Sequence, residues 1–193
     1  MTETYSIVIA GDGGVGKSSI TLRFVNNVFV DKYNPSLENS YRKTLEVDSK
    51  IFMLEITDTA GQEEFRSIRD FQLNKSDGFI LVYSLFEKST LDEISSIRDK
   101  ILLLQNLEKD DLKTKKVPIV IAGNKVDLEK DQQREVYAKE TKELSKSWGI
   151  PFYETSAKEN INIDILFIQC VRRIRQYKQK PVPSHSKKFC LIL

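Results

Sequence analysis

Residues 11–18, GDGGVGKS, combine glycines, a lysine and a serine at the spacing of a phosphate-binding loop. The glycines let successive backbone N–H groups curl around phosphate oxygens, because no Cβ stands in the way. Lys17 can bridge the outer phosphates as a point charge, and the Ser18 hydroxyl is a hard oxygen ligand suited to Mg²⁺. A glycine-rich turn before a helix is the plainer interpretation. The motif, however, stands between an apolar run and a segment with helical spacing, which favours a phosphate site.

An acidic residue and a glutamine follow another apolar run, in the sequence DTAGQ at 58–62. At the carboxyl end of a strand, Asp58 would face the phosphate loop and could hold Mg²⁺ through a water. Gly61 permits close backbone approach, and Gln62 offers a donor and an acceptor that could orient a water molecule. Alone, this sequence is typical of a turn. After a phosphate loop and a strand, it indicates a sensor of the metal and the γ-phosphate.

The sequence NKVD at 124–127 ends a further apolar run and provides a carboxylate for base recognition. Asp127 can accept two parallel N–H bonds from N1 and the exocyclic N2 of guanine. Adenine would leave this carboxylate unpaired, a mismatch worth roughly 10⁴-fold in discrimination. After the next apolar run, the pocket can be completed by Ser156, Ala157 and Lys158. A solvated polar turn is the alternative for NKVD taken alone.

The motifs adjoin short apolar runs, which identifies the elements that must position them. Continuous runs rich in Val, Ile and Phe predict strands buried on both faces: Tyr5–Ala10, Ile51–Ile56, Gly78–Ser84, Val117–Gly123 and Ile150–Thr155. Helical spacing predicts five helices: Lys17–Asn26, Phe65–Asn74, Ser89–Leu107, Gln132–Trp148 and Ile163–Tyr177. Strand Ser40–Val47 should join the next one through a hairpin at Asp48–Lys50. We therefore expect an α/β fold, with a mostly parallel six-stranded sheet, one antiparallel edge strand and helices on both faces.

The composition excludes several classes of protein. The 193 residues suffice for one substantial core, and 40% hydrophobic and 30% charged residues are ordinary for a globular domain. Thirty basic and 28 acidic residues give a formal net charge of +2, so no nucleic-acid partner is expected. Two cysteines and one histidine exclude a disulfide framework and a Cys/His zinc site, and Cys170 should fill the core. We find neither a signal peptide nor an apolar run long enough to cross a membrane.

The motifs GDGGVGKS, DTAGQEE, NKVD and TSAK follow one another as in small GTPases, and the chain resembles this superfamily over nearly its whole length. The segment YNPSLENSYRK at 33–43 is most similar to the first switch of the Ras and Rap subfamily. The resemblance implies a P-loop NTPase fold, the Ras-like G domain, over residues 1–177, with GTP/GDP and Mg²⁺ as ligands. It also implies a signalling switch: effectors bind the GTP state, a GTPase-activating protein (GAP) accelerates slow hydrolysis, and an exchange factor resets the cycle.

The resemblance also gives roles to residues outside the motifs. Phe29 would pack against the guanine, Tyr33 would cover the phosphates, and Ser36 would complete the Mg²⁺ shell in the GTP state. Gln62 would orient the attacking water. Ras-like chains usually carry Thr and Asp where this chain has Ser36 and Asn39, so the identity of the effectors stays open.

The implied sites fall into four sets. The catalytic set is Gln62, Lys17 and Gly13. The nucleotide-binding set is Gly14, Val15, Gly16, Lys17, Ser18, Ser19, Phe29, Tyr33, Ser36, Gly61, Asn124, Lys125, Asp127, Ser156, Ala157 and Lys158. The metal set is Ser18, Ser36 and, through water, Asp58. The effector region is Tyr33, Asn34, Pro35, Ser36, Leu37, Glu38, Asn39, Ser40 and Tyr41.

The last residues, KQKPVPSHSKKFCLIL, show no helical period, and we predict a disordered tail at 178–193. Cys190 begins a C-a-a-X box whose final Leu favours a geranylgeranyl group. One lipid chain anchors weakly, so a second signal is expected from the lysines of the tail: Lys178, Lys180, Lys187 and Lys188. These features predict a monomer at the cytoplasmic face of a membrane, namely the plasma membrane.

Two other classes of protein share the phosphate loop. A P-loop enzyme that uses nucleotide for chemistry, such as a small-molecule kinase, is disfavoured by NKVD and the C-terminal box. A nucleotide-binding adaptor that never hydrolyses is disfavoured by Gln62 and Gly13, although the sequence alone does not exclude it. No arginine of the chain is obviously placed as a finger in cis, so a GAP is expected to supply one.

Overall fold

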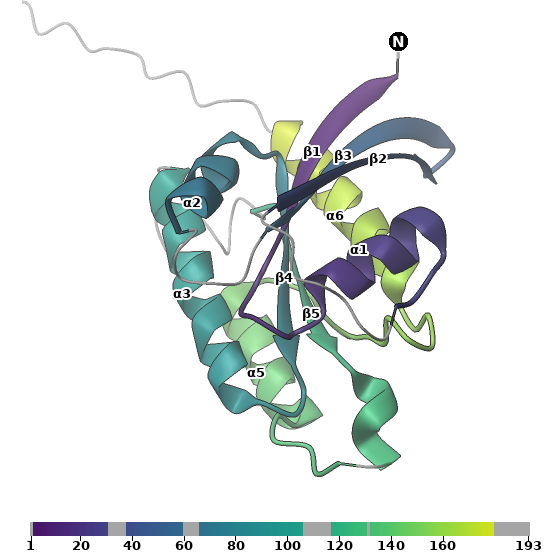
Figure 1. Ribbon diagram of the computed structural model, residues 1–193. Helices are drawn as coiled ribbons and strands as arrows, with labels where there is room; N and C mark the ends of the chain where they lie inside the picture. The colour runs from purple at the N-terminus through teal and green to yellow at the C-terminus, as the bar shows by residue number, and fades with distance from the viewer. Residues whose placement is uncertain (1, 31–37, 60–65, 106–116, 131, 180–193) are drawn as a thin grey trace, which may run out of the picture.

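The computed structural model describes residues 2–30, 38–59, 66–105, 117–130 and 132–179. At its centre is a six-stranded sheet in the order β2-β3-β1-β4-β5-β6 (Figure 1). The strands are β1 (Glu3–Ala10), β2 (Glu38–Val47), β3 (Lys50–Thr59), β4 (Gly78–Ser84), β5 (Ile119–Asn124) and β6 (Phe152–Glu154). Only β2 and β3 pair antiparallel among these strands. The predicted fold class, including the antiparallel edge strand, is confirmed.

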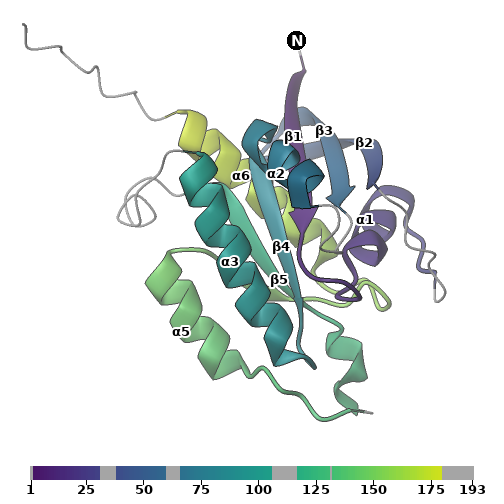
Figure 2. The same ribbon diagram turned by 60° about the vertical axis from the view of Figure 1, so that its left-hand side comes forward.

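Helices cover both faces of the sheet. They are α1 (Lys17–Asn26), α2 (Arg66–Lys75), α3 (Lys88–Leu104), α5 (Ala138–Trp148) and α6 (Ile163–Lys178), with a short 3₁₀ helix, η2 (Val126–Lys130). Helices α1 and α6 lie on one face, and α2, α3 and α5 lie on the other (Figures 1 and 2). None of the helices described here combines the length and the apolar character needed to cross a bilayer.

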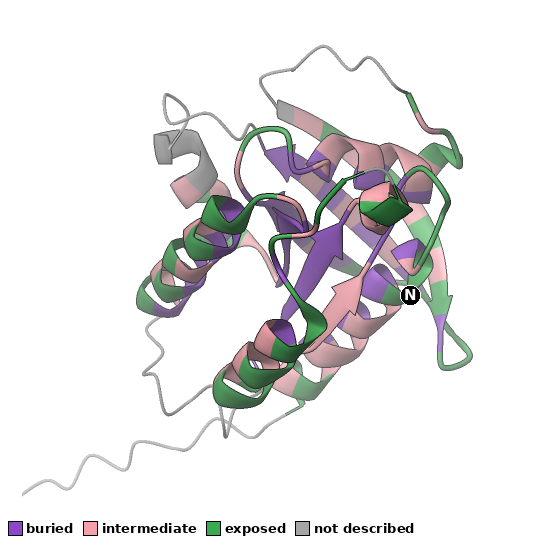
Figure 3. Ribbon diagram, turned by 90° about the horizontal axis from the view of Figure 1, so that it is seen from below, coloured by how far each residue is buried: buried purple, intermediate pink, exposed green. Residues whose placement is uncertain are grey.

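The core is split into two layers by the sheet. Strand β1 contributes to both, because successive side chains of a strand point to opposite faces. Ile7 and Ile9 pack with residues of α1 and α6, whereas Val8 packs with buried residues on the face covered by α2 and α3. Buried residues therefore follow the central strands (Figure 3). Cys170 of α6 is fully buried, which confirms its predicted place in the core.

The hairpin between β2 and β3 is tighter than its sequence suggested. Asp48 and Ser49 both have left-handed backbone angles, with φ of 51° and 61°, and Val47 pairs directly with Lys50. A two-residue loop with two positive φ angles matches the right-handed twist of the flanking strands. Lys50 therefore belongs to β3 rather than to the turn.

The helix predicted over Gln132–Trp148 was wrong in its first part, because α5 begins only at Ala138. Tertiary contacts prevent an earlier start. The backbone N–H groups of Glu135 and Val136 donate to the Leu85 carbonyl oxygen, at 3.0 Å each, and Val136 is buried. These donors are satisfied by another element, so they need no helical partner. The other predicted elements differ from the observed ones by a few residues at their ends, and η2 was not predicted.

Candidate functional site

The predicted motifs meet at one edge of the sheet. In the strand register Ile9 lies beside Asp58, Ser84 beside Asn124, and Gly123 beside Glu154. The loops that follow β1, β3, β5 and β6 therefore leave the sheet at the same carboxyl edge, where ligands of open α/β sheets bind.

Within the phosphate loop, the residue directly before α1 must be glycine. Gly16 is the N-cap residue of α1, and its φ of 96° is left-handed. A Cβ on Gly16 would lie 2.3 Å from the Asn124 side-chain nitrogen, which is too close for any real contact. The bare backbone thus allows Asn124 to contact the start of α1, where the N–H groups of the first turn and the helix dipole favour an anion.

Lys17 folds back over the phosphate loop. Its side chain is mostly buried, and Nζ donates to the Asp12 carbonyl oxygen at 2.6 Å. The Asp12 carboxylate accepts from the Gly13 N–H at 2.6 Å, so it is engaged by the loop itself. A mostly buried lysine held against the loop by the Asp12 carbonyl group gives this loop a positive character suited to phosphate oxygens.

Ser18 and Asp58 form the part of the site that fits a metal. The Ser18 hydroxyl donates to Asp58 Oδ2, and Asp58 is only 4% exposed. Within the described part of the chain, the other carboxylate oxygen, Oδ1, is buried and has no hydrogen-bond partner. Burial raises the pKa of Asp58 above its ordinary value. The Ser18 hydrogen bond and the Lys17 charge lower this pKa but only partly offset the effect of burial. Two hard oxygens, with one acceptor unsatisfied, fit Mg²⁺ or a water bound to it.

The part of the site predicted to bind the base, called the base side, consists of the loops after β5 and β6. Side chains join these two loops. The Ser156 hydroxyl donates to Asp127 Oδ1 at 2.6 Å, and the Val126 N–H donates to the Thr155 carbonyl oxygen at 3.1 Å. The remaining acceptor positions of the Asp127 carboxylate can take donors from a ligand. The loops after β5 and β6 thus form one unit around Asp127.

Asn124 connects this unit to the phosphate loop. Its side-chain nitrogen donates to the Val15 carbonyl oxygen at 2.9 Å, and its oxygen accepts from the Thr155 hydroxyl at 3.2 Å. Asn124 is 2% exposed, so its amide binds protein groups. Its direct contact with a nucleotide stays a prediction. Its role as a bridge was not evident from the sequence.

Arg23 is a further residue that sequence reasoning missed. It lies in α1, and its guanidinium donates to the carbonyl oxygens of Ala157 and Lys158 at 2.8 and 2.9 Å. These bonds fix the loop after β6 onto the helix that follows the phosphate loop. No sequence motif signals this contact, because the partners are 134 and 135 residues apart.

The roles of Phe29 and of the effector region stay predictions. Phe29 packs partly against the core beneath α1 and α6, and Asn39, Ser40 and Tyr41 lie in edge strand β2. The predictions outside the described residues or side chains concern Tyr33, Asn34, Pro35, Ser36, Leu37, Glu38, Gly61, Gln62 and Cys190.

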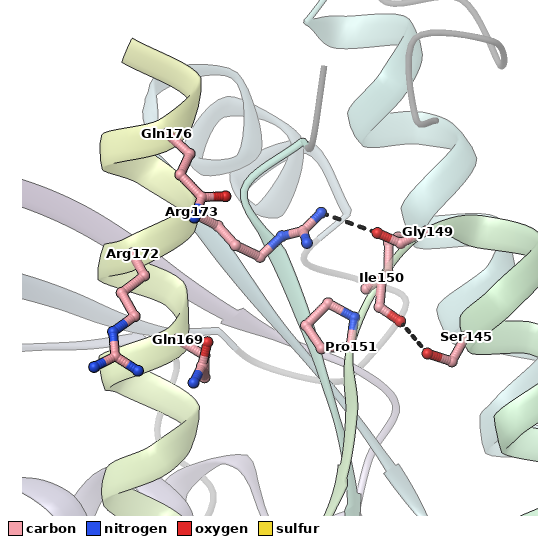
Figure 4. A pocket seen from close by; sticks show the side chains of 8 residues that line it. All are labelled: Ser145, Gly149, Ile150, Pro151, Gln169, Arg172, Arg173 and Gln176. Carbon is pink, nitrogen blue, oxygen red and sulfur yellow. Dashed lines mark hydrogen bonds between the residues drawn. The ribbon is translucent and has the colours of Figure 1, made fainter. Parts of the chain in front are cut away.

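A separate hollow of about 370 Å³ lies between α6 and the end of α5 (Figure 4). Two of its polar side chains bind backbone carbonyl oxygens. Arg173 donates to the carbonyl oxygens of Val117 and Gly149, at 2.8 and 3.2 Å, and the Ser145 hydroxyl donates to that of Ile150 at 2.7 Å. The hollow contains none of the predicted site residues.

The fold and the phosphate loop define a P-loop nucleotide-binding domain, and the comparisons with known proteins narrow this class. The Ras family model matches residues 6–176. Ras-like protein rasC of Dictyostelium discoideum is 42% identical over 197 residues, with both chains covered completely. The chain therefore belongs to the Ras family, whose members bind GTP and hydrolyse it to GDP.

Proposed function

We propose that this protein is a signalling switch of the Ras/Rap type, which binds effectors when loaded with GTP and resets by slow hydrolysis. The observation that carries the proposal is the Asn124 bridge to Val15. It holds the NKVD loop against the phosphate loop, so a single guanine nucleotide can reach both.

In this proposal, each group of site residues has a separate role. Asp127, oriented by Ser156, would accept the two N–H donors of guanine. Lys17 would contact the outer phosphates. Ser18 and Asp58 would hold Mg²⁺, which supplies positive charge at the phosphates when bound. Gln62 would orient the water, and a GAP would supply the missing arginine.

Edge strand β2 is proposed as part of the effector surface. Asn39, Ser40 and Tyr41 lie in this strand, within the segment 33–43 that resembles the first switch. Nucleotide-dependent ordering of such a segment would change what the edge presents to partners. Effectors, the GAP and an exchange factor would recognise these surfaces.

Membrane attachment is proposed through a geranylgeranyl group on Cys190, at the cytoplasmic face of the plasma membrane. Lys178 pairs with Asp77 at 2.8 Å and lies over the Tyr5 ring, so the domain already engages its ammonium. The electrostatic contribution should therefore come from the remaining lysines of the tail: Lys180, Lys187 and Lys188. Fractionation at two ionic strengths tests this: Cys190→Ser should release the protein fully, and neutralising the three lysines should release it partly. Full retention of the lysine-neutralised protein would indicate another anchor.

Single-turnover hydrolysis of pre-bound GTP, with and without a Ras- or Rap-type GAP, tests the central proposal. We expect a slow rate alone and an acceleration of about 10³–10⁵-fold with the matching GAP. A kinase would instead transfer phosphate to a small molecule, and an adaptor would retain GTP under both conditions. Either result would contradict the proposal.

A further inference from the structure

Arg134 lies between η2 and α5, in the segment that was predicted to be helical. Its guanidinium forms an ion pair with Glu154, in which Nη1 lies 3.2 Å from Oε2 and Nη2 binds Oε1. Nη1 also lies 3.4 Å from Glu129 Oε1, and Nε donates to the Val136 carbonyl oxygen. The arginine side chain is 10% exposed, so solvent screens the pair with Glu154 only partly.

The partners of Arg134 belong to the two loops of the base side. Glu129 follows Asp127 by two residues within η2, and Glu154 ends β6, two residues before Ser156. The Glu154 carbonyl oxygen also accepts from the Asn162 side chain at 2.7 Å, which closes the loop after β6. Arg134 thus connects the same two loops that Asp127 and Ser156 connect, through a separate set of bonds.

The segment that carries Arg134 is itself anchored elsewhere. The Glu135 and Val136 N–H groups bind the Leu85 carbonyl oxygen, and the Glu135 carboxylate accepts from the Lys88 N–H at 2.8 Å. Both partners lie at the end of β4 and the start of α3. Arg134 therefore contacts both base loops from a segment that is also held by residues between β4 and α3.

We propose that Arg134 is a positioning residue of the guanine pocket, which holds Asp127 and Ser156 at the separation that guanine requires and so slows GDP release. The inference rests on the proposed role of Asp127. A bidentate arginine–carboxylate pair restrains both distance and angle, which a single hydroxyl–carboxylate bond does not. Without it, the two loops would remain joined by the Ser156–Asp127 bond and by the bonds of Thr155 with Val126 and Asn124, none of which is a pair of opposite charges.

The chain contains a matched control. Arg172 of α6 pairs in the same way with Asp48, donating from Nη2 to Oδ1 at 2.6 Å and from Nε to Oδ2 at 3.3 Å. That pair joins α6 to the turn between β2 and β3, so it touches neither base loop. The Arg172 side chain is 41% exposed, against 10% for Arg134, so the unfolding midpoint of each variant is measured as well. A loss of stability would lower the midpoint, whereas a loss of positioning would accelerate GDP release only in the Arg134 variant.

Release of a fluorescent GDP in the presence of Mg²⁺ and excess unlabelled GDP is the first test. Arg134→Ala and Glu154→Gln should each accelerate release about tenfold, as expected for the loss of a charge-assisted pair. The double variant should be no faster than the single ones, because both remove one interaction. Arg172→Ala should release GDP at the parent rate. Arg134→Lys, which keeps the charge without the fork, should give an intermediate rate and serves if the alanine variant does not fold.

The affinity ratio of GDP to inosine diphosphate is a readout that general destabilisation would not change. Inosine diphosphate lacks the exocyclic amino group from which Asp127 would accept a hydrogen bond. If Arg134 positions Asp127, the preference for GDP over inosine diphosphate should fall about threefold in Arg134→Ala. A parent-like release rate, or faster release with an unchanged preference, would overturn the inference. The parent protein is measured first against ADP. A parent that does not prefer GDP to ADP would contradict the guanine site itself rather than the role of Arg134.

Discussion

The phosphate side and the base side of the site are built in different ways. The phosphate side comes from the consecutive residues 11–18, shaped by the backbone, with Asp58 added by the neighbouring strand. The base side comes from two loops whose joined residues, Asp127 and Ser156, are 29 positions apart, and it depends on bonds between side chains. Backbone geometry fixes the first, and a side-chain network fixes the second.

The two carboxylates of the site differ in the same way. Asp58 is almost fully buried, and within the described residues one of its oxygens has no partner. Asp127 is half-buried and already accepts from Ser156. In the proposed function, a bound cation would complete the phosphate side, whereas the protein itself holds the base side before a ligand binds. Substitutions on the base side should change affinity and base choice, and those on the phosphate side should change metal use and hydrolysis.

The largest effect is expected from Asp127→Asn. The amide replaces one acceptor with a donor that faces the N–H groups of guanine, so the preference for GDP over xanthosine diphosphate should change by about 10⁴-fold. Competition between labelled GDP and xanthosine diphosphate measures it. Asp92→Asn, an exposed carboxylate of α3, is the control. If the variant binds xanthosine diphosphate no better than the parent does, Asp127 is not the residue that recognises guanine.

Gly13→Val should separate binding from hydrolysis on the phosphate side. A Cβ on Gly13 would have no atom within 4 Å among its described surroundings, so nucleotide affinity should be preserved. The branched side chain would stand where the arginine of a GAP must enter, and GAP-stimulated hydrolysis should fall by about 10³-fold or more. Gln62→Leu should give a similar loss because leucine cannot orient water. An unimpaired stimulated rate in either variant would remove that residue from the mechanism.

Asp58→Asn should weaken the dependence on metal while leaving base choice unchanged. The amide keeps an acceptor for Ser18 but removes the charge, so the Mg²⁺ concentration needed to slow GDP release should rise about 10–100-fold. Glu55→Gln is a matched change in the same strand, where the carboxylate instead pairs with Arg42 at 2.7 Å. Equal metal dependence in the two variants would mean that Asp58 does not support the cation.

The smallest effect is expected from Ser36→Thr, at a position outside the described residues. Threonine has fewer χ1 states to lose when the first switch closes, so the closed-to-open ratio should rise about fivefold. Phosphorus NMR of the γ-phosphate in a GTP-analogue complex reports these populations. Identical spectra for the parent and the variant would show that the missing methyl group has no influence on closure.

The order of the strands and α-helices, the antiparallel edge and the place of the phosphate loop could all be predicted from the sequence, and Asp127 as the base carboxylate stays a prediction. These features follow from local rules. Buried strands read as continuous apolar runs, and a phosphate loop needs glycine, lysine and serine at fixed spacing. The helix that Gln132 was expected to begin shows where such rules fail, since Leu85 accepts the N–H groups of Glu135 and Val136.

The bonds that join the two sides of the site could not be predicted from the sequence. Arg23 reaches the loop after β6, Asn124 binds the carbonyl oxygen of Val15, and Arg134 pairs with Glu154. None of these pairs has a sequence signature, because a long polar side chain can satisfy its donors with many partners. Which partner it meets depends on the register of the sheet and the packing of the helices, and these are set by apolar contacts across the whole chain.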